Sequence, residues 1–131
     1  MHAPSYKVPV LSCKQAKHFE ASILGDQDSE WSAMKRAGQG IARQLVDDYS
    51  ELRPAPEYLR VLALIGKGNN AGDALITCGQ LLADYPRARV DLILTSPAGE
   101  LSPLAARALI ELEGRVHSHQ ITSKEDFSDL T

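Results

Sequence analysis

Hydrophobic positions in the first fifty residues recur at helical spacing. Within residues 34–46 the apolar and small residues return every three or four positions while charged residues take the other faces, a pattern typical of an amphipathic helix. An earlier helix is predicted at 12–24, because Ser12 and Gln15 have the spacing of a capping box. Residues 25–29, between these helices, are predicted to form a polar turn.

From residue 60 onward the pattern changes to short apolar runs separated by helical segments. Residues 61–65 are apolar at every position, as in a strand of a parallel sheet that is covered on both faces. Further strands are predicted at 90–95 and 115–121, with helices at 74–85 and 103–113 between them. This alternation predicts half of a doubly wound, Rossmann-like α/β fold with a parallel sheet in three αβα layers, preceded by an N-terminal helical arm.

Two glycines, Gly38 and Gly40, lie inside the helix predicted at 34–46. Glycine in a helix interior costs about 1 kcal/mol relative to alanine. Small residues kept in a helix despite this cost usually allow another backbone to come close. We therefore interpret both glycines as packing positions.

The length and composition of the chain favour one ordinary globular domain, spanning 1–131. The hydrophobic content of 44% is sufficient for a core. The net charge is −3, and positive residues are not concentrated in any segment as nucleic-acid binding requires. The longest apolar run, 61–65, is far shorter than the roughly 20 residues of a membrane span. We expect a cytoplasmic protein with no membrane or nucleic-acid partner, and with Cys13 and Cys78 as reduced, mostly buried thiols.

The chemically distinctive segment is a glycine-rich loop at 66–73, between the strand predicted at 61–65 and the helix that follows. In open α/β sheets, ligands bind beyond the carboxyl ends of the strands. Gly66 and Gly68 let a ligand approach the main chain, and the free N–H groups at the start of a helix favour phosphate or another anion. The glycine spacing fits neither the dinucleotide fingerprint nor a Walker A loop, so spacing alone does not identify the ligand.

Asn69, Asn70 and Asp73 add polar side chains to this loop. Two adjacent carboxamides supply neutral oxygens for a hard cation and N–H₂ groups for phosphates or an amide-bearing ring. Asp73 is predicted to lie in the first turn of the helix, where the dipole keeps its carboxylate ionised. The structural alternative is that Asp73 and one asparagine cap the helix and hold the turn.

Together with the strand before it, this loop resembles the signature of the YjeF N-terminal domain family, whose enzymes are NAD(P)H-hydrate epimerases. In that family an apolar strand runs into Gly-x-Gly-Asn-Asn-Gly-Gly-Asp and then into a helix. Residues 61–75 here read Val-Leu-Ala-Leu-Ile-Gly-Lys-Gly-Asn-Asn-Ala-Gly-Asp-Ala-Leu. The resemblance extends to residues 10–16 and 34–38 and covers most of 8–95.

The resemblance implies a substrate, a cation and partners. Family members interconvert the R and S forms of hydrated NADH and NADPH (NADHX and NADPHX), and a companion ADP- or ATP-dependent dehydratase completes the repair. By resemblance, Asn70 would be a ligand of a potassium ion, and the protein would form a homodimer or be fused to the dehydratase. The residues that would line the site of the dinucleotide substrate are Asn69, Asn70, Ala71, Gly72 and Asp73.

Two features depart from the family pattern. Ala71 stands where the family has glycine, and its methyl would be tolerated beside a backbone N–H contact but strained at positive φ. The chain also stops at Thr131, before the fourth strand that supplies a catalytic-site Asp in the family, so we expect it to be incomplete at its C-terminal end. The catalytic acid and base stay unassigned. The alternative function is a non-catalytic nucleotide-binding, oligomerisation or scaffold module.

Other residues with candidate chemistry receive structural interpretations. His117 and His119 alternate on a predicted strand and share one face, but no cysteine or carboxylate cluster at ligand spacing favours a metal site. Trp31 is interpreted as a packing residue near a helix start. Asp91 lies at the beginning of its strand, away from the carboxyl end where a ribose-binding acid is expected.

Overall fold

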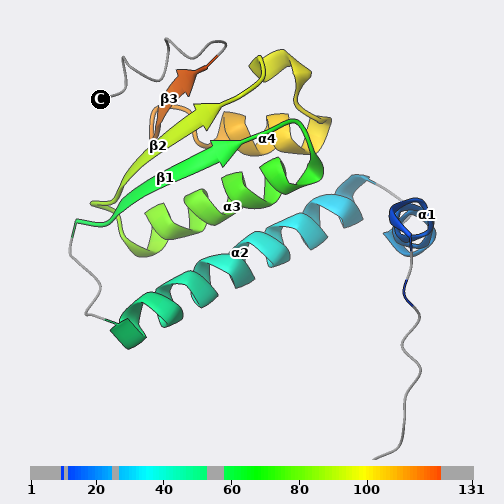
Figure 1. Cartoon of the computed structure of the whole chain (residues 1–131), viewed down its shortest axis with the longest axis horizontal. Coiled ribbons are helices and arrows are strands. Elements are labelled where there is room, and N and C mark those ends of the chain that lie inside the picture. The colour runs from blue at the N-terminus through cyan, green and yellow to red at the C-terminus, as the bar shows by residue number, and fades with distance from the viewer. Residues whose placement is uncertain (1–9, 11, 25–26, 53–57, 122–131) are drawn as a thin grey trace, which may run out of the picture. The chain divides into compact units, whose positions relative to one another are not determined.

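Contacts within the chain define two compact units, residues 1–31 and 32–131. The first contains α1 and the start of α2, and the second contains the rest of α2 and a parallel sheet with its helices (Figure 1). A single domain over 1–131 stays a prediction. The structure is a computed structural model and describes residues 10, 12–24, 27–52 and 58–121.

The helix α1, Cys13–Leu24, begins where the capping box predicts. The backbone N–H of Ser12 donates to Oε1 of Gln15 at 2.9 Å, and the N–H of Gln15 donates to Oγ of Ser12 at 3.2 Å. This reciprocal pair satisfies donors that have no acceptor within the helix. The helix predicted at 12–24 is therefore confirmed.

The helix α2, Gln27–Leu52, is longer than the hydrophobic pattern predicts. It includes most of the segment 25–29, so the predicted polar turn is wrong from Gln27 onward. Asp28 and Glu30 lie in the first turn, where the amino-terminal end of the helix dipole stabilises carboxylates. These acidic residues therefore belong to a helix start.

The sheet contains three parallel strands in the spatial order β1-β2-β3. Because this order advances in one direction, right-handed crossovers place both connecting helices on the same face of the sheet (Figure 1). The predicted alternation of strands and helices is thus confirmed, and the fold is of the Rossmann-like α/β class. In chain order these elements are β1 (Arg60–Ile65), α3 (Asn69–Asp84), β2 (Arg89–Leu94), α4 (Pro103–Glu111) and β3 (His117–Gln120).

The two faces of the sheet have different surroundings in the described part of the chain. On the face covered by α3 and α4, Ile65 and Leu92 are fully buried. On the opposite face, Leu62 and Leu64 are each 68% exposed. The expectation that the strand at 61–65 is covered on both faces is therefore wrong for the described residues, because both crossover helices lie on one side.

The helix α2 packs against α3 through a close approach at Gly38. Oγ1 of Thr77 in α3 lies 3.1 Å from the carbonyl oxygen of Gly38. A Cβ at Gly38 would overlap the side chain of Ile76, so the predicted packing role of this glycine is confirmed. A Cβ at Gly40 would meet nothing within 4 Å, so the same interpretation is wrong for Gly40.

Burial and capping confirm the expectations for Trp31, Cys78 and Ser102 but not for Cys13. Trp31 and Cys78 are buried, as expected of packing residues, whereas Cys13 is exposed on α1, contrary to expectation. The Ser102 hydroxyl accepts a hydrogen bond from the N–H of Ala105 at 3.3 Å and caps α4 as predicted. In the described part of the chain, every helix is too short or too polar to span a bilayer.

Candidate functional site

The turn from Gly66 to Gly68 connects the carboxyl end of β1 to α3. Gly68 is the N-cap residue of α3 and has an extended backbone, with φ −75° and ψ 179°. Because glycine has no side chain, the N-cap supplies no side-chain acceptor for the N–H groups of the first turn, which begins at Asn69. A Cβ at either glycine would meet nothing within 4 Å. An anion can therefore approach this helix start.

Asp73 lies one turn deeper in α3 than the sequence predicts. The helix begins at Asn69, so Asp73 falls in the second turn and neither caps the helix nor sits where the dipole is strongest. Burial raises the pKa of the Asp73 carboxyl above its ordinary value, which opposes the predicted effect of the dipole. Both the first-turn placement and the capping role of Asp73 are therefore wrong.

Asn70 and Asp73 are brought together by the helix. Residues three apart on a helix lie on the same side, and both line a hollow of about 280 Å³. Asn70 is exposed and Asp73 is half-buried, so the hollow presents a carboxamide at its rim and a carboxyl further in. The remaining lining is mostly apolar and comes from α2, β1 and α3: Ile41, Leu45, Val61, Leu62, Ala63, Ala74, Thr77, Cys78 and Leu81.

Ala71 and Gly72 lie on a different side of α3 from this hollow. Ala71 is 4% exposed, and its N–H donates to the carbonyl oxygen of Gly68 at 3.0 Å. A Cβ at Gly72 would overlap the thioether of Met34 in α2, so this glycine permits helix packing. Since every non-glycine residue in the described ranges has negative φ, the methyl of Ala71 is unstrained.

The loop after β2 completes the same edge of the site, although the glycine-rich loop alone did not predict it. The N–H and the hydroxyl of Thr95 donate to the carbonyl oxygen of Ile65, at 3.1 Å and 3.2 Å. The 3₁₀ helix η1, Ala98–Glu100, follows, and Oε2 of Glu100 lies 3.1 Å from Nζ of Lys67. Adjacent parallel strands end side by side, so the polar residues after the second predicted strand were the available signal.

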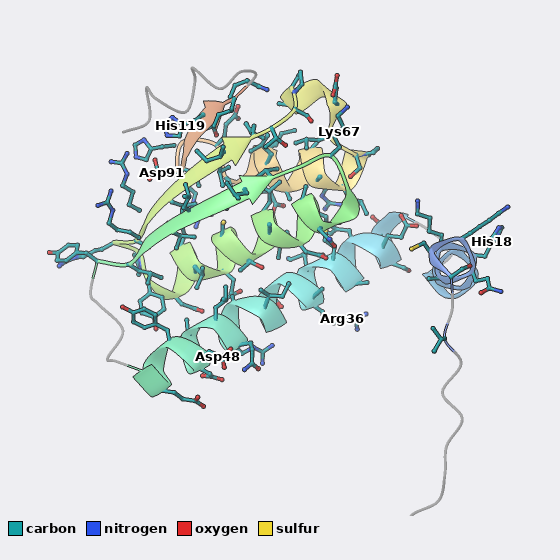
Figure 2. All side chains as sticks on the ribbon, viewed as in Figure 1. His18, Arg36, Asp48, Lys67, Asp91 and His119 are labelled. Carbon is teal, nitrogen blue, oxygen red and sulfur yellow. The ribbon has the colours of Figure 1, made fainter. Side chains whose placement is uncertain are left out.

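A second polar cluster lies toward the amino ends of the strands, on the face opposite α3. Asp91 accepts hydrogen bonds from Nε and an NH₂ group of Arg89, at 3.0 Å and 3.2 Å, and its Oδ1 lies 3.1 Å from Nε2 of His119. The hydrogen bond from Arg89 is the main cause that lowers the pKa of Asp91 to about 2. Figure 2 labels Asp91 and His119 close together and Lys67 toward the other end of the strands.

The described residues contain no cluster of three or more His, Cys, Asp and Glu side chains that could hold a metal ion. His119 is paired with Asp91, a carboxylate 28 positions away that spacing along the chain did not indicate. At the hollow, Asn70 and Asp73 offer oxygen donors of the kind that a hard cation prefers. The donor chemistry of Asn70 therefore fits an alkali ion, with further oxygen ligands required from other groups.

Comparison with known proteins relates most of the chain to one family. The family model described as YjeF-related protein N-terminus matches residues 31–130. A bifunctional NAD(P)H-hydrate repair enzyme, Nnr, from Salinibacter ruber is 36% identical over 107 residues, which cover 77% of this chain and 19% of that protein. An enzyme of the same name from Gloeobacter violaceus is 31% identical over 113 residues, covering 83% of this chain and 20% of the relative. The chain spans about one fifth of the length of these curated relatives.

Proposed function

The chain belongs to the family of YjeF-related protein N-termini, and on this premise we propose that it is the NAD(P)H-hydrate epimerase part of a cytoplasmic cofactor-repair system. Its reaction would interconvert the R and S forms of NADHX and NADPHX. The similar proteins are named bifunctional NAD(P)H-hydrate repair enzymes, which supports this substrate class. The observation that carries the proposal is that Asn70 and Asp73 line one hollow, beside a helix start that has no side-chain cap.

Each part of the site has a role in this proposal. The N–H groups at the start of α3 would bind phosphate oxygens of the dinucleotide, with Asn69 and Asn70 beside them. Asn70 would contact the amide-bearing ring, while Ala71 and Gly72, on another side of α3, would support the site through helix packing. Asp73 has a raised pKa and would donate a proton to the ring hydroxyl as its C–O bond breaks and water leaves. It would take the proton back as water adds to the opposite face, which inverts the hydrated carbon with no net change in composition.

A potassium ion is part of the proposed site. Its fit rests on Asn70, whose side chain is exposed and lines the hollow, with Asp73 on the same side of α3. The ion would supply positive charge that offsets the phosphates of the substrate. Asn70 would hold the ion while the backbone amides orient the dinucleotide.

The test uses the full-length protein with R-NADHX, an S-specific dehydratase and its nucleotide, and follows the recovery of NADH absorbance. We expect faster recovery than the spontaneous rate, and a loss of at least tenfold in Asn70→Ala and Asp73→Ala, on the scale of one charged or polar contact at a reacting centre. Gln80→Ala and Asp84→Ala are matched controls, because these side chains are hydrogen-bonded to each other at 3.0 Å near the far end of α3. If the unaltered protein restores NADH absorbance no faster than the spontaneous reaction, the proposal is refuted.

The second candidate is a non-catalytic nucleotide-binding, oligomerisation or scaffold module. The observation in its favour is the exposure of Leu62 and Leu64 on the face of the sheet opposite α3, since neighbouring exposed leucines are typical of a surface that contacts another protein. A homodimer and a functional or fused ADP- or ATP-dependent dehydratase are the proposed partners in either case. Crystals soaked with NADP or AMP that have no density near Gly68, together with an inactive full-length protein, would favour this candidate.

A further inference from the structure

Lys67 and Glu100 join the two loops that follow β1 and β2. Nζ of Lys67, in the glycine-rich turn, lies 3.1 Å from Oε2 of Glu100, at the end of η1. The side chain of Lys67 is 66% exposed and that of Glu100 is 50% exposed, so water reaches both ends of the ion pair. Figure 2 labels Lys67 at the turn between β1 and α3. The pair therefore stands beside the helix start where a phosphate is proposed to bind.

Because this ion pair is exposed, Lys67 can readily exchange Glu100 for a competing anion. Pairs between exposed side chains gain little net free energy, because water and salt screen the charges and two long side chains must be held still. A phosphate offers the same lysine several anionic oxygens, while its other oxygens contact the N–H groups of α3. A Cβ at Gly66, Gly68 or Gly99 would meet nothing within 4 Å, so both loops leave space for a ligand.

We propose that Lys67 is a substrate-binding residue that exchanges Glu100 for a phosphate of the dinucleotide, and that Glu100 limits the affinity for that phosphate by competing for the lysine. This inference rests on the proposed function, because it needs an anionic ligand at the start of α3. It assigns opposite effects to the two residues. Without Glu100 the lysine is free for phosphate, whereas without Lys67 the phosphate loses its cationic partner.

The experiment measures binding of NADP to the full-length protein by isothermal titration calorimetry, at low and at raised salt. We expect Lys67→Gln to weaken binding roughly tenfold and Glu100→Gln to strengthen it about threefold at low salt, with both effects shrinking as salt rises. Lys67→Arg should retain most of the affinity, since it keeps the positive charge. In the Lys67→Gln background, Glu100→Gln should give a smaller gain than in the unaltered protein, because no lysine remains to be released.

Matched controls come from the amino-terminal edge of the sheet. Arg60→Gln removes a positive charge at the start of β1, and Glu113→Gln removes a negative charge shortly before β3 begins; both side chains are exposed. Neither should change the affinity for NADP beyond measurement error. If the unaltered protein binds NADP and the Lys67 and Glu100 variants bind it equally well, the inference is overturned while the proposed function stands. If neither the unaltered protein nor any variant binds NADP, the proposed phosphate site at the start of α3 is refuted.

Discussion

The hydroxyl of Thr77 lies 3.1 Å from the carbonyl oxygen of Gly38 and 2.8 Å from the carbonyl oxygen of Asp73. One buried side chain of α3 thus connects the backbone of α2 to the turn of α3 that contains Asp73. The contact forms only because α2 has no side chain at Gly38, where a Cβ would overlap Ile76. The packing of two helices therefore fixes the position of a residue at the candidate site.

Substitution of the two glycines of α2 should have opposite effects on stability. Gly38→Ala should lower the free energy of unfolding by about 1–3 kcal/mol, because the new methyl overlaps Ile76 and forces the helices apart. Gly40→Ala should raise it by about 0.5–1 kcal/mol, because alanine favours the helix and meets nothing within 4 Å. Urea unfolding followed by circular dichroism measures both changes. Equal effects of the two substitutions would contradict the packing described for Gly38.

The hydroxyl of Thr77 should matter more than its methyl group. Thr77→Val keeps the shape of the side chain but leaves the Gly38 carbonyl without this donor, so we expect a loss of about 1–2 kcal/mol in the free energy of unfolding. Thr77→Ser keeps the hydroxyl and should lose less than Thr77→Val. Denaturant titrations of the two variants provide the comparison, and a Val variant as stable as the native protein would refute it.

The Arg89–Asp91 pair should make stability depend on acid pH. The pKa of Asp91 is about 2 in the folded protein against an ordinary value of 3.8, so its ionised form is favoured by folding. This contribution is present above pH 3.8 and is lost as the pH falls toward 2. Because the cluster faces solvent, we expect Asp91 to contribute about 1 kcal/mol. Asp91→Asn should remove this part of the acid-induced loss, measured as unfolding free energy at neutral pH and in steps down to pH 2.

Replacing Ala71 with the glycine of the family pattern should improve neither stability nor activity. Ala71 is buried in the first turn of α3 with an unstrained backbone, so its methyl packs without cost to the loop. Ala71→Gly should therefore reduce the free energy of unfolding by about 1 kcal/mol through lost helix propensity and burial. We expect no gain in epimerase activity of the full-length variant. A more active variant would indicate that the methyl obstructs the substrate.

The sequence was a good guide to elements with strong local signals. The capping box at Ser12 and the proline-led start of α4 after Ser102 lie where predicted, because side chain-to-backbone bonds of a few residues determine them. The apolar run before Gly66 predicted β1, although the exposure of Leu62 and Leu64 depends on which face the crossover helices cover. Local pattern contains no information about that choice.

The candidate site was predictable in its location but less so in its geometry. The glycine-rich turn lies between strand and helix as expected, yet Asn69 already belongs to α3, which moved Asp73 into the second turn. A glycine N-cap without a side-chain acceptor gives no marker in the sequence for the first helical residue. The ion pair between Lys67 and Glu100 spans 33 positions and arises only when β1 and β2 lie side by side.

The two leucines on the open face of β1 also bear on how the chain behaves in dilute and concentrated solution. Leaving a leucine in water forgoes about 1.5–3 kcal/mol relative to full burial, so Leu62 and Leu64 gain whenever another apolar surface covers them. At higher protein concentration, collisions between molecules are more frequent and more of these leucines become covered. Self-association of the 131-residue chain should therefore rise with its concentration, and a charged residue at Leu62 or Leu64 should keep it dispersed.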